Sequence, residues 1–231
     1  KNKIVRKGAR IAVIGLGYVG LPLAIAYAKK GFSVLGIDVD KQRLSRIREK
    51  VSYITDVPQN QLREVIARKS FTVSDSFSAL AGTDIVIICV PTPLKRRYHP
   101  DISFIIDAVR EVCSFLHAGQ LIVLESTTYP GTTEEEILPL LEKKGLSCGK
   151  EFFLAFSPER IDPGNRKFTL EKIPKVIGGL TPEATELTGL LYKHIVDRVV
   201  PVSSARVAET AGTTVDQSFW RLTSHGNPTS G

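Results

Sequence analysis

A glycine-rich turn near the start of the chain constrains its fold more than any other feature. The β-branched run over residues 11–14 reads IAVI and ends at Gly15, and GLGYVG then places Gly17 and Gly20 before the apolar segment LPLAIAYAKKG. The run is typical of a strand buried on both faces, and the next segment of a helix. The first glycine permits a tight turn, the second leaves room for a pyrophosphate, and the third lets the helix pack close. This pattern predicts a helix whose N-terminal amides bind phosphate.

An acidic residue follows the second predicted strand at the spacing that a dinucleotide site requires. FSVLGID ends at Asp38, which lies 18 positions beyond Gly20 (38 minus 20), against the roughly 20 expected. Its carboxylate can accept hydrogen bonds from both ribose hydroxyls of NAD, whereas its negative charge would repel the 2′-phosphate of NADP. Lys41 and Arg43 lie nearby and weaken that preference. The sequence therefore predicts an NAD site, and the alternative is a glycine turn without a ligand.

Strand-like and helix-like segments alternate through most of the chain. Strand-like runs such as DIVIICV, LIVLES and FFLAFS are separated by helix-like segments such as SFIIDAVREVCSFL. This alternation predicts an α/β fold of the Rossmann-like, doubly wound type, with a mostly parallel sheet and helices on both faces. In such sheets ligands bind outside the carboxyl ends of the strands. The loops CVPTP, ESTTYPG and SPERIDPGN are therefore candidate parts of a site.

Those loops carry small hydroxyl and charged side chains, and residue type alone does not decide whether they bind a ligand. Thr92 and Thr127 are possible hydrogen-bond donors to a ligand, but such residues are also common in turns and helix caps. Glu159 could accept a proton, and Arg160 could bind a phosphate or carboxylate with its planar guanidinium. A surface ion pair on a Pro-rich loop is the alternative for this pair.

Composition and charge exclude several classes of partner. The chain has 31 Lys and Arg residues and 24 Asp and Glu residues, for a net charge of +7, but no basic run interleaved with aromatics, so no nucleic-acid partner is expected. No apolar run reaches bilayer length and no secretory signal is visible, which predicts no membrane association and a cytoplasmic location. Three widely spaced cysteines without a CxxC pair indicate reduced thiols and no metal site.

Five motifs in series resemble one enzyme family. GLGYVGLPLA, the DVD after the second strand, CVPTPL with a following PD, LESTTYPGTTEEE, and SPERIDPGN with IPKVIGG are similar to motifs of the UDP-glucose/UDP-N-acetyl-hexosamine 6-dehydrogenases. STTYPGTTEEE and SPERIDPGN resemble most the bacterial UDP-N-acetylglucosamine 6-dehydrogenases of surface-polysaccharide synthesis. The resemblance runs from about residue 8 to Glu209.

The resemblance implies an NAD-dependent oxidation of the C6 alcohol of a UDP-sugar to a carboxylate, through an aldehyde held by a catalytic cysteine. Thr127 and Glu159 are then expected to be catalytic, with Thr127 helping to position the attacking water. Glu159, Arg160 and Ile161 are expected to face the UDP-sugar. By motif position, NAD is expected to contact Gly15, Gly17, Tyr18, Val19, Gly20, Asp38, Arg43, Thr92 and Thr127.

The end of the chain departs from the family pattern. The family's catalytic lysine and a following asparagine would stand where this chain has Gly212 and Asp216, and no cysteine lies in the family's GGHC context. We therefore expect an NAD-binding domain over residues 1–209 and an atypical tail over residues 210–231, disordered or foreign to the family. The central dimerisation helix and C-terminal UDP-binding domain are expected to be absent. A chain without methionine that begins with Lys is expected to be a truncated, inactive piece, and the family's homodimer is uncertain for it.

Two other functions stay open from the sequence. The chain could be a free-standing NAD-binding module that senses or regulates without catalysis. It could also be another Rossmann oxidoreductase, of the 3-hydroxyacid or 6-phosphogluconate type, which shares the glycine turn. SPERIDPGN and STTYPGTT count against the second of these.

Overall fold

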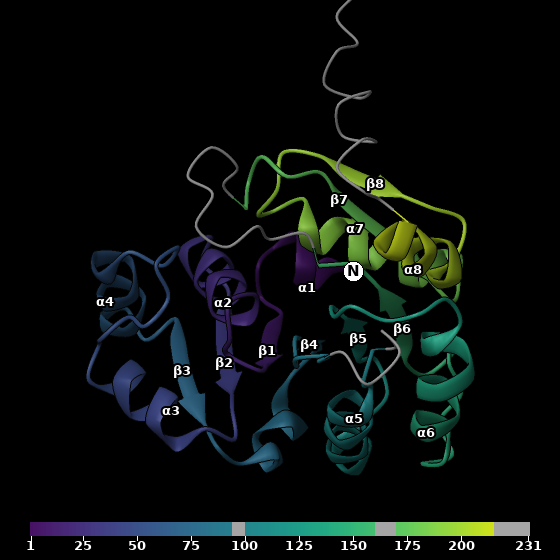
Figure 1. Ribbon diagram of the computed structural model, residues 1–231, viewed down its shortest axis with the longest axis horizontal. Coiled ribbons are helices and arrows are strands. Elements are labelled where there is room, and N and C mark those ends of the chain that lie inside the picture. The colour runs from purple at the N-terminus through teal and green to yellow at the C-terminus, as the bar shows by residue number, and fades with distance from the viewer. Residues whose placement is uncertain (94–99, 160–169, 215–231) are drawn as a thin grey trace, which may run out of the picture.

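One eight-stranded sheet runs through the computed structural model, which describes residues 1–93, 100–159 and 170–214 (Figure 1). Its strands consist largely of apolar residues, and β4 and β5 are buried along their whole length, as expected of strands covered on both faces. The strands are β1 (Arg10–Ile14), β2 (Ser33–Ile37), β3 (Phe71–Ser74), β4 (Ile85–Ile88), β5 (Leu121–Leu124), β6 (Phe153–Phe156), β7 (Lys175–Gly179) and β8 (Val199–Pro201).

The strand order is β3-β2-β1-β4-β5-β6-β7-β8. All neighbouring strands are parallel except β6 and β7, which are antiparallel. The chain winds outward from β1 in one direction to β3 and in the other to β6, so the order reverses between β1 and β4. This arrangement confirms the predicted doubly wound, mostly parallel fold. The reversal marks the crevice in which open α/β sheets bind ligands.

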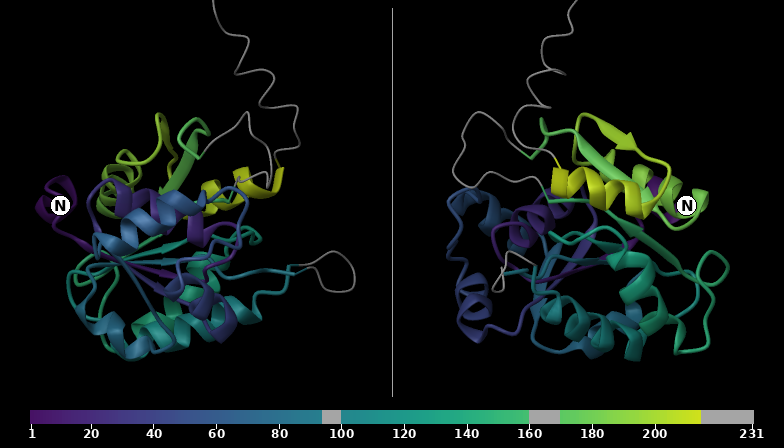
Figure 2. Two further views of the ribbon diagram at one scale, coloured as in Figure 1. Left: turned by 90° about the vertical axis from the view of Figure 1, so that its left-hand side faces the viewer. Right: turned by 45° about the vertical axis from the view of Figure 1, so that its right-hand side comes forward.

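Helices cover both faces of the sheet (Figures 1 and 2). One apolar core joins α1, α2, α3, α4 and α7 to the sheet, and a second core joins α5, α6 and α8 to its other face. The helices are α1 (Asn2–Val5), α2 (Gly20–Lys29), α3 (Lys41–Arg48), α4 (Gln59–Ala67), the 3₁₀-helix η1 (Phe77–Gly82), α5 (Ser103–Phe115), the π-helix η2 (Thr132–Ile137), α6 (Leu138–Glu142), α7 (Pro182–Tyr192) and α8 (Ala205–Thr214).

Three local features could not be read from the strand and helix pattern alone. The amino terminus forms α1, which precedes β1 and buries Ile4 in the first core. The helix after the glycine turn begins at Gly20, one residue before the apolar segment LPLAIAYAKKG. The segment after ESTTYPG is split into η2 and α6, with Pro139 in the first turn of α6. Proline lacks the amide hydrogen that a continuous helix would need there.

Regular structure also crosses the domain boundary expected between residues 209 and 210. Helix α8 continues to Thr214, and the Thr210 hydroxyl donates to the Arg206 carbonyl oxygen at 2.9 Å, one turn back. The expectation for residues 215–231 lies outside the described residues. In the described part of the chain, no helix has the length and apolar character needed to cross a bilayer.

Candidate functional site

The glycine turn between β1 and α2 has the geometry of a phosphate cradle. Gly15 has φ +87°, and a Cβ there would lie 2.6 Å from the Cys89 carbonyl oxygen, so a side chain is excluded. At Gly20 a Cβ would collide with the Gly15 carbonyl oxygen. Gly17 is different, because a Cβ there would meet nothing within 4 Å. Gly15 and Gly20 therefore make the turn possible, because neither position has room for a side chain. Gly17 leaves open space in front of α2.

Replacing Gly17 should separate ligand binding from folding. Gly17→Ala adds a methyl group to the open space, so we expect an unchanged melting temperature. The same methyl group would obstruct a pyrophosphate at the backbone, so NAD affinity should fall at least several-fold, about 1 kcal/mol or more. Differential scanning fluorimetry and calorimetric titration measure the two effects. A variant that binds NAD as tightly as the wild type would place the pyrophosphate elsewhere.

Asp38 lies directly beside this turn. Its side chain is 4% exposed. One carboxylate oxygen accepts the Leu16 amide at 2.7 Å, and the other accepts the Asp40 amide at 2.9 Å. Arg43, on α3, forms ion pairs with Asp38 at 3.2 Å and with Asp40 at 3.3 Å. The structure thus brings Asp38 and Arg43 together at the carboxyl end of β2, next to the glycines.

Tyr53 is a part of this region that the sequence analysis missed. Its hydroxyl donates to the Leu16 carbonyl oxygen at 2.7 Å, so Asp38 and Tyr53 hold the peptide groups of Leu16 from both sides. Burial and the neighbouring Asp38 raise the pKa of Tyr53 well above its usual range, so the hydroxyl stays a donor at neutral pH. Tyr53 lies in the loop before α4, with no motif around it to single it out.

A groove of about 580 Å³ opens beside Asp38, outside the carboxyl ends of β1, β2 and β4. One end has Asp38, Asp40 and Arg43, and the α5 side chains Asp107, Arg110 and Glu111 also line the groove, while the rest of its walls are apolar. That combination suits a nucleoside, with a polar ribose and a flat base. The apolar lining residues are Ile14, Ile37, Val39, Phe77, Val90, Pro91, Phe104 and Ala108.

The remaining expected cofactor residues surround the mouths of the same strands. Tyr18 is 58% exposed and Val19 is almost buried, both in the turn before α2. Thr92 is half-buried after β4, and Thr127 is exposed after β5. The neighbouring Thr128 is buried, and its hydroxyl has no hydrogen-bond partner among the described residues. Of Thr127 and Thr128, only Thr127 therefore has a hydroxyl that a ligand can reach.

Glu159 follows β6 and has the electrostatic environment of a proton carrier. Its pKa is raised to about 7, mainly because the group is buried and also because Glu125 is near, while Lys175 lowers it. A carboxyl group that ionises near neutral pH is suited to general acid or base chemistry. The expected substrate residues Arg160 and Ile161 lie outside the described residues.

The raised pKa of Glu159 predicts a pH-dependent contribution to stability. A carboxyl group with a higher pKa in the folded chain than its ordinary 4.5 stabilises the fold at low pH, and this contribution is lost as the pH rises from about 4.5 to about 7. Glu159→Gln cannot ionise, so its free energy of unfolding should fall less over that range, by up to about 3 kcal/mol. Urea unfolding at pH 4.5 and pH 8 measures this. Equal pH dependence in both proteins would contradict a raised pKa.

Comparison with known proteins identifies the family. The model of the UDP-glucose/GDP-mannose dehydrogenase family, NAD binding domain, matches residues 9–196. The chain belongs to this family. The match covers the glycine turn, the end of β2 and the loops after β4, β5 and β6.

Relatives of this family domain include nucleotide-sugar dehydrogenases. The UDP-N-acetyl-D-glucosamine 6-dehydrogenase of Pseudomonas aeruginosa is 38% identical over 207 residues, which cover 89% of this chain and 48% of that protein. Protein CapL of Staphylococcus aureus is 39% identical over 203 residues, 87% of this chain and 47% of that protein. The solved UDP-D-ManNAc dehydrogenase of Pyrococcus horikoshii superposes with a TM-score of 0.82 at 36% identity, over 88% of this chain and 49% of that one. The chain spans about half the length of these relatives.

Three further residues of this dehydrogenase-family domain escaped the sequence analysis because they meet only in the fold. Glu125 after β5, Lys175 at the start of β7 and Tyr192 at the end of α7 form one buried polar cluster. Lys175 was visible in the sequence as a charge beginning an apolar strand. Nothing in the sequence indicated its partners.

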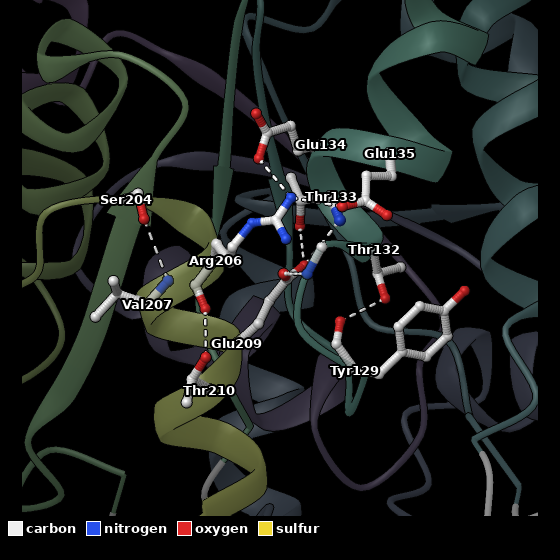
Figure 3. Close-up of polar contacts among 11 residues, drawn as sticks. Tyr129, Thr132, Thr133, Glu134, Glu135, Ser204, Arg206, Val207, Glu209 and Thr210 are labelled. Atoms are coloured by element: carbon white, nitrogen blue, oxygen red, sulfur yellow. Dashed lines mark hydrogen bonds and ion pairs between the residues drawn. The ribbon is translucent and has the colours of Figure 1, made fainter.

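Helix α8 is tied to the Thr127 loop through a buried carboxylate (Figure 3). Glu209, 1% exposed, accepts hydrogen bonds from the Gly131 amide at 2.6 Å, the Thr133 amide at 2.8 Å and the Thr133 hydroxyl at 2.6 Å. It therefore satisfies amides at the start of η2 that have no partner within that helix. Beside it, the exposed Arg206 pairs with Glu134 and Glu135 at the surface. In the sequence Glu209 marks only the end of the family resemblance, whereas in the structure it supports the loop.

Proposed function

We propose that this chain binds NAD across the reversal between β1 and β4. The observation that carries the proposal is the position of Asp38, whose carboxylate contacts the glycine turn and lines the groove. The ribose of the adenosine would hydrogen-bond this carboxylate, and the base would enter the apolar part of the groove. The pyrophosphate would lie over Gly17 and the first amides of α2.

The residues present suit such a cofactor. Gly17 leaves the space that a pyrophosphate needs. Within the described residues, one oxygen of Asp38 accepts a single hydrogen bond, so it retains capacity for a ribose hydroxyl. Displacement of Arg43 would free the second oxygen for another hydroxyl. The buried negative charge opposes a 2′-phosphate, so NAD is preferred over NADP.

We further propose that the chain is the NAD-binding half of a UDP-N-acetyl-hexosamine 6-dehydrogenase. When bound, NAD would supply the hydride acceptor for oxidation of the sugar C6 alcohol. Thr127 would hold a hydroxyl or water at the carboxyl end of β5, and Glu159 would accept or return a proton. Arg160 and Ile161 would face the UDP-sugar. The identities of 36–39% to UDP-N-acetyl-D-glucosamine 6-dehydrogenases and CapL support this choice.

The family's catalytic lysine is expected at a position that holds Gly212 in this chain. This supports the proposal that the chain alone binds NAD but does not oxidise a sugar. Gly212 occupies that position on α8, and a Cβ there would lie 2.9 Å from the Cβ of Pro158. A lysine at this position would therefore require the loop of Pro158 and Glu159 to shift. We propose that sugar oxidation needs the family's second half, which would also complete a homodimer.

Two experiments, performed one after the other, test the proposal. Calorimetric titration of the chain should give NAD binding that is at least tenfold tighter than NADP binding. The C-terminal half of a family relative is then joined after Glu209, which keeps the carboxylate that supports η2. This fusion should produce NADH with a UDP-N-acetyl-hexosamine and not with the free sugar. Absence of NAD binding would refute the cofactor site, and a fusion that binds NAD but oxidises no UDP-sugar would refute the substrate class.

A further inference from the structure

Lys175 is a buried cation with two partners that hold it in one place. Its side chain is 6% exposed, and its ammonium group forms an ion pair with the fully buried carboxylate of Glu125. The same group donates to the Pro158 carbonyl oxygen at 3.2 Å and lies 5.2 Å from the centroid of the Tyr192 ring. The Tyr192 hydroxyl donates to the other oxygen of Glu125. A buried charge needs such pairing and hydrogen bonding to be tolerated.

The pairing of β6 with β7 brings Lys175 close to Glu159. These strands are antiparallel, with Phe156 opposite Gly178. Carried three residues further, the same register places Glu159 opposite Lys175. The Ser157 hydroxyl donates to a β7 carbonyl oxygen at 2.8 Å, so the two segments stay together beyond their last paired residues. Backbone geometry and the hydrogen bond to Pro158 therefore both place Lys175 at the peptide that precedes Glu159.

Among the described residues, three ionisable groups of neighbouring elements interact electrostatically with the Glu159 carboxyl group. Glu125, after β5, raises its pKa, and Lys175 lowers it. Cys89, after β4, is buried, and burial raises the pKa of its thiol well above the usual range, so this group is neutral near pH 7. In the described part of the chain, Glu159 consequently lies in the field of one buried acid, Glu125, and its paired cation, Lys175.

We propose that Lys175 is a positioning residue for Glu159. By donating at once to the Glu125 carboxylate and the Pro158 carbonyl oxygen, it fixes the peptide before Glu159 and supplies the positive charge that favours the ionised carboxylate. The catalytic meaning of this control rests on the proposed function, because only there does Glu159 carry a proton for the reaction. The control itself is a property of the chain without any ligand.

The first test measures the ionisation of Glu159 in a background that lacks the Glu125 charge. The titration midpoint is read from the side-chain carboxyl resonance in ¹³C spectra, assigned by its loss in Glu159→Gln. Glu125→Gln should lower the midpoint below that of the wild type, because the like charge is removed while Lys175 stays. Adding Lys175→Met should raise the midpoint again, by about one pH unit or more relative to Glu125→Gln. Equal midpoints in the single and double variants would overturn the proposal.

A conservative variant separates charge from packing. Glu125→Gln with Lys175→Arg keeps a cation and its donors, so its midpoint should stay near that of Glu125→Gln alone. A merely structural role would shift the midpoint in the same direction for Arg and Met, since both change the shape of the side chain. That outcome would also count against Lys175 as the source of the charge.

A second readout does not depend on the folding of Glu125→Gln. The double variant Glu125→Gln/Lys175→Met replaces the buried ion pair with neutral groups of similar size, a change that proteins often tolerate. The ¹³C resonance of the Pro158 carbonyl group should move upfield in this variant, because the carbonyl loses its charged donor. An unchanged resonance would show that Lys175 does not hold this peptide.

NAD titration of the same samples distinguishes this inference from the proposed function. The adenosine and pyrophosphate groups of NAD are expected at Asp38 and the glycine turn. ADP-ribose carries both groups, so the double variant should bind ADP-ribose with wild-type affinity. If the wild type binds no NAD, the proposed function fails while the Glu159 titration remains interpretable. If NAD binds and the titration ignores Lys175, only the inference about Lys175 fails.

Discussion

Replacing Asp38 with asparagine is expected to weaken NAD binding about 10- to 100-fold. The carboxylate would lose charge-assisted hydrogen bonds to the ribose, which contribute roughly 1.5–3 kcal/mol. The amide nitrogen of asparagine would also face either the Leu16 or the Asp40 amide, both of which now donate to Asp38. Affinity for NADP should fall less, because the charge that opposes the 2′-phosphate is removed. Calorimetric titration with both dinucleotides measures the two affinities and their ratio.

Asp40→Asn is the matched control for Asp38. Asp40 lies two residues away, caps α3 by accepting the Gln42 and Arg43 amides, and pairs with the same Arg43. Asparagine caps helices about as well as aspartate, so NAD affinity should change by less than about threefold. A folded Asp38→Asn protein with wild-type affinity for NAD would refute the assigned role of Asp38.

Replacing Glu209 with alanine should produce the largest loss of stability among the variants considered. The change leaves three donors of Gly131 and Thr133 without their buried acceptor. Each unsatisfied buried group costs roughly 1–3 kcal/mol, and partial access of water reduces the sum, so a loss of about 3 kcal/mol is expected. Urea unfolding measures the free energy. Hydrogen exchange should show that the Gly131 and Thr133 amides lose protection while amides of β1 do not.

Arg206→Ala tests whether Glu209 acts through burial rather than through its position on α8. Arg206 lies one turn earlier on the same helix and forms ion pairs at the surface with Glu134 and Glu135. Exposed ion pairs contribute little to stability, so this variant should unfold close to the wild type. If both variants were equally stable, the hydrogen bonds of Glu209 would not be what holds the loop.

The glycine turn and its acid could be predicted because their chemistry is local in sequence. A buried strand, a required glycine at Gly15 and an acid at the end of the next strand follow one another within about forty residues. Their spacing reflects the geometry of a single strand, helix and strand unit. The α/β class was predictable for the same reason, since each buried strand is a short continuous apolar run and each helix has its own period.

Other features were not predictable from local pattern. The amides at the start of η2 depend on an acceptor far along the chain, because Glu209 lies 78 positions away from Gly131. The short helix α1 is stabilised by burial of Ile4 and by contact with α7. Neither partner is visible in the segment itself.

The sequence by itself determined the fold class, the place of the glycine turn and the identity of the acid beside it. Only the tertiary structure decided which charges surround Glu159. Lys175 and Glu125 are 50 positions apart, and Tyr192 and Glu125 are 67 apart. Such partners meet only when the strands and helices pack and exclude water. A buried charge is tolerated only beside a counter-charge or hydrogen-bond partner, and that partner can come from any part of the chain.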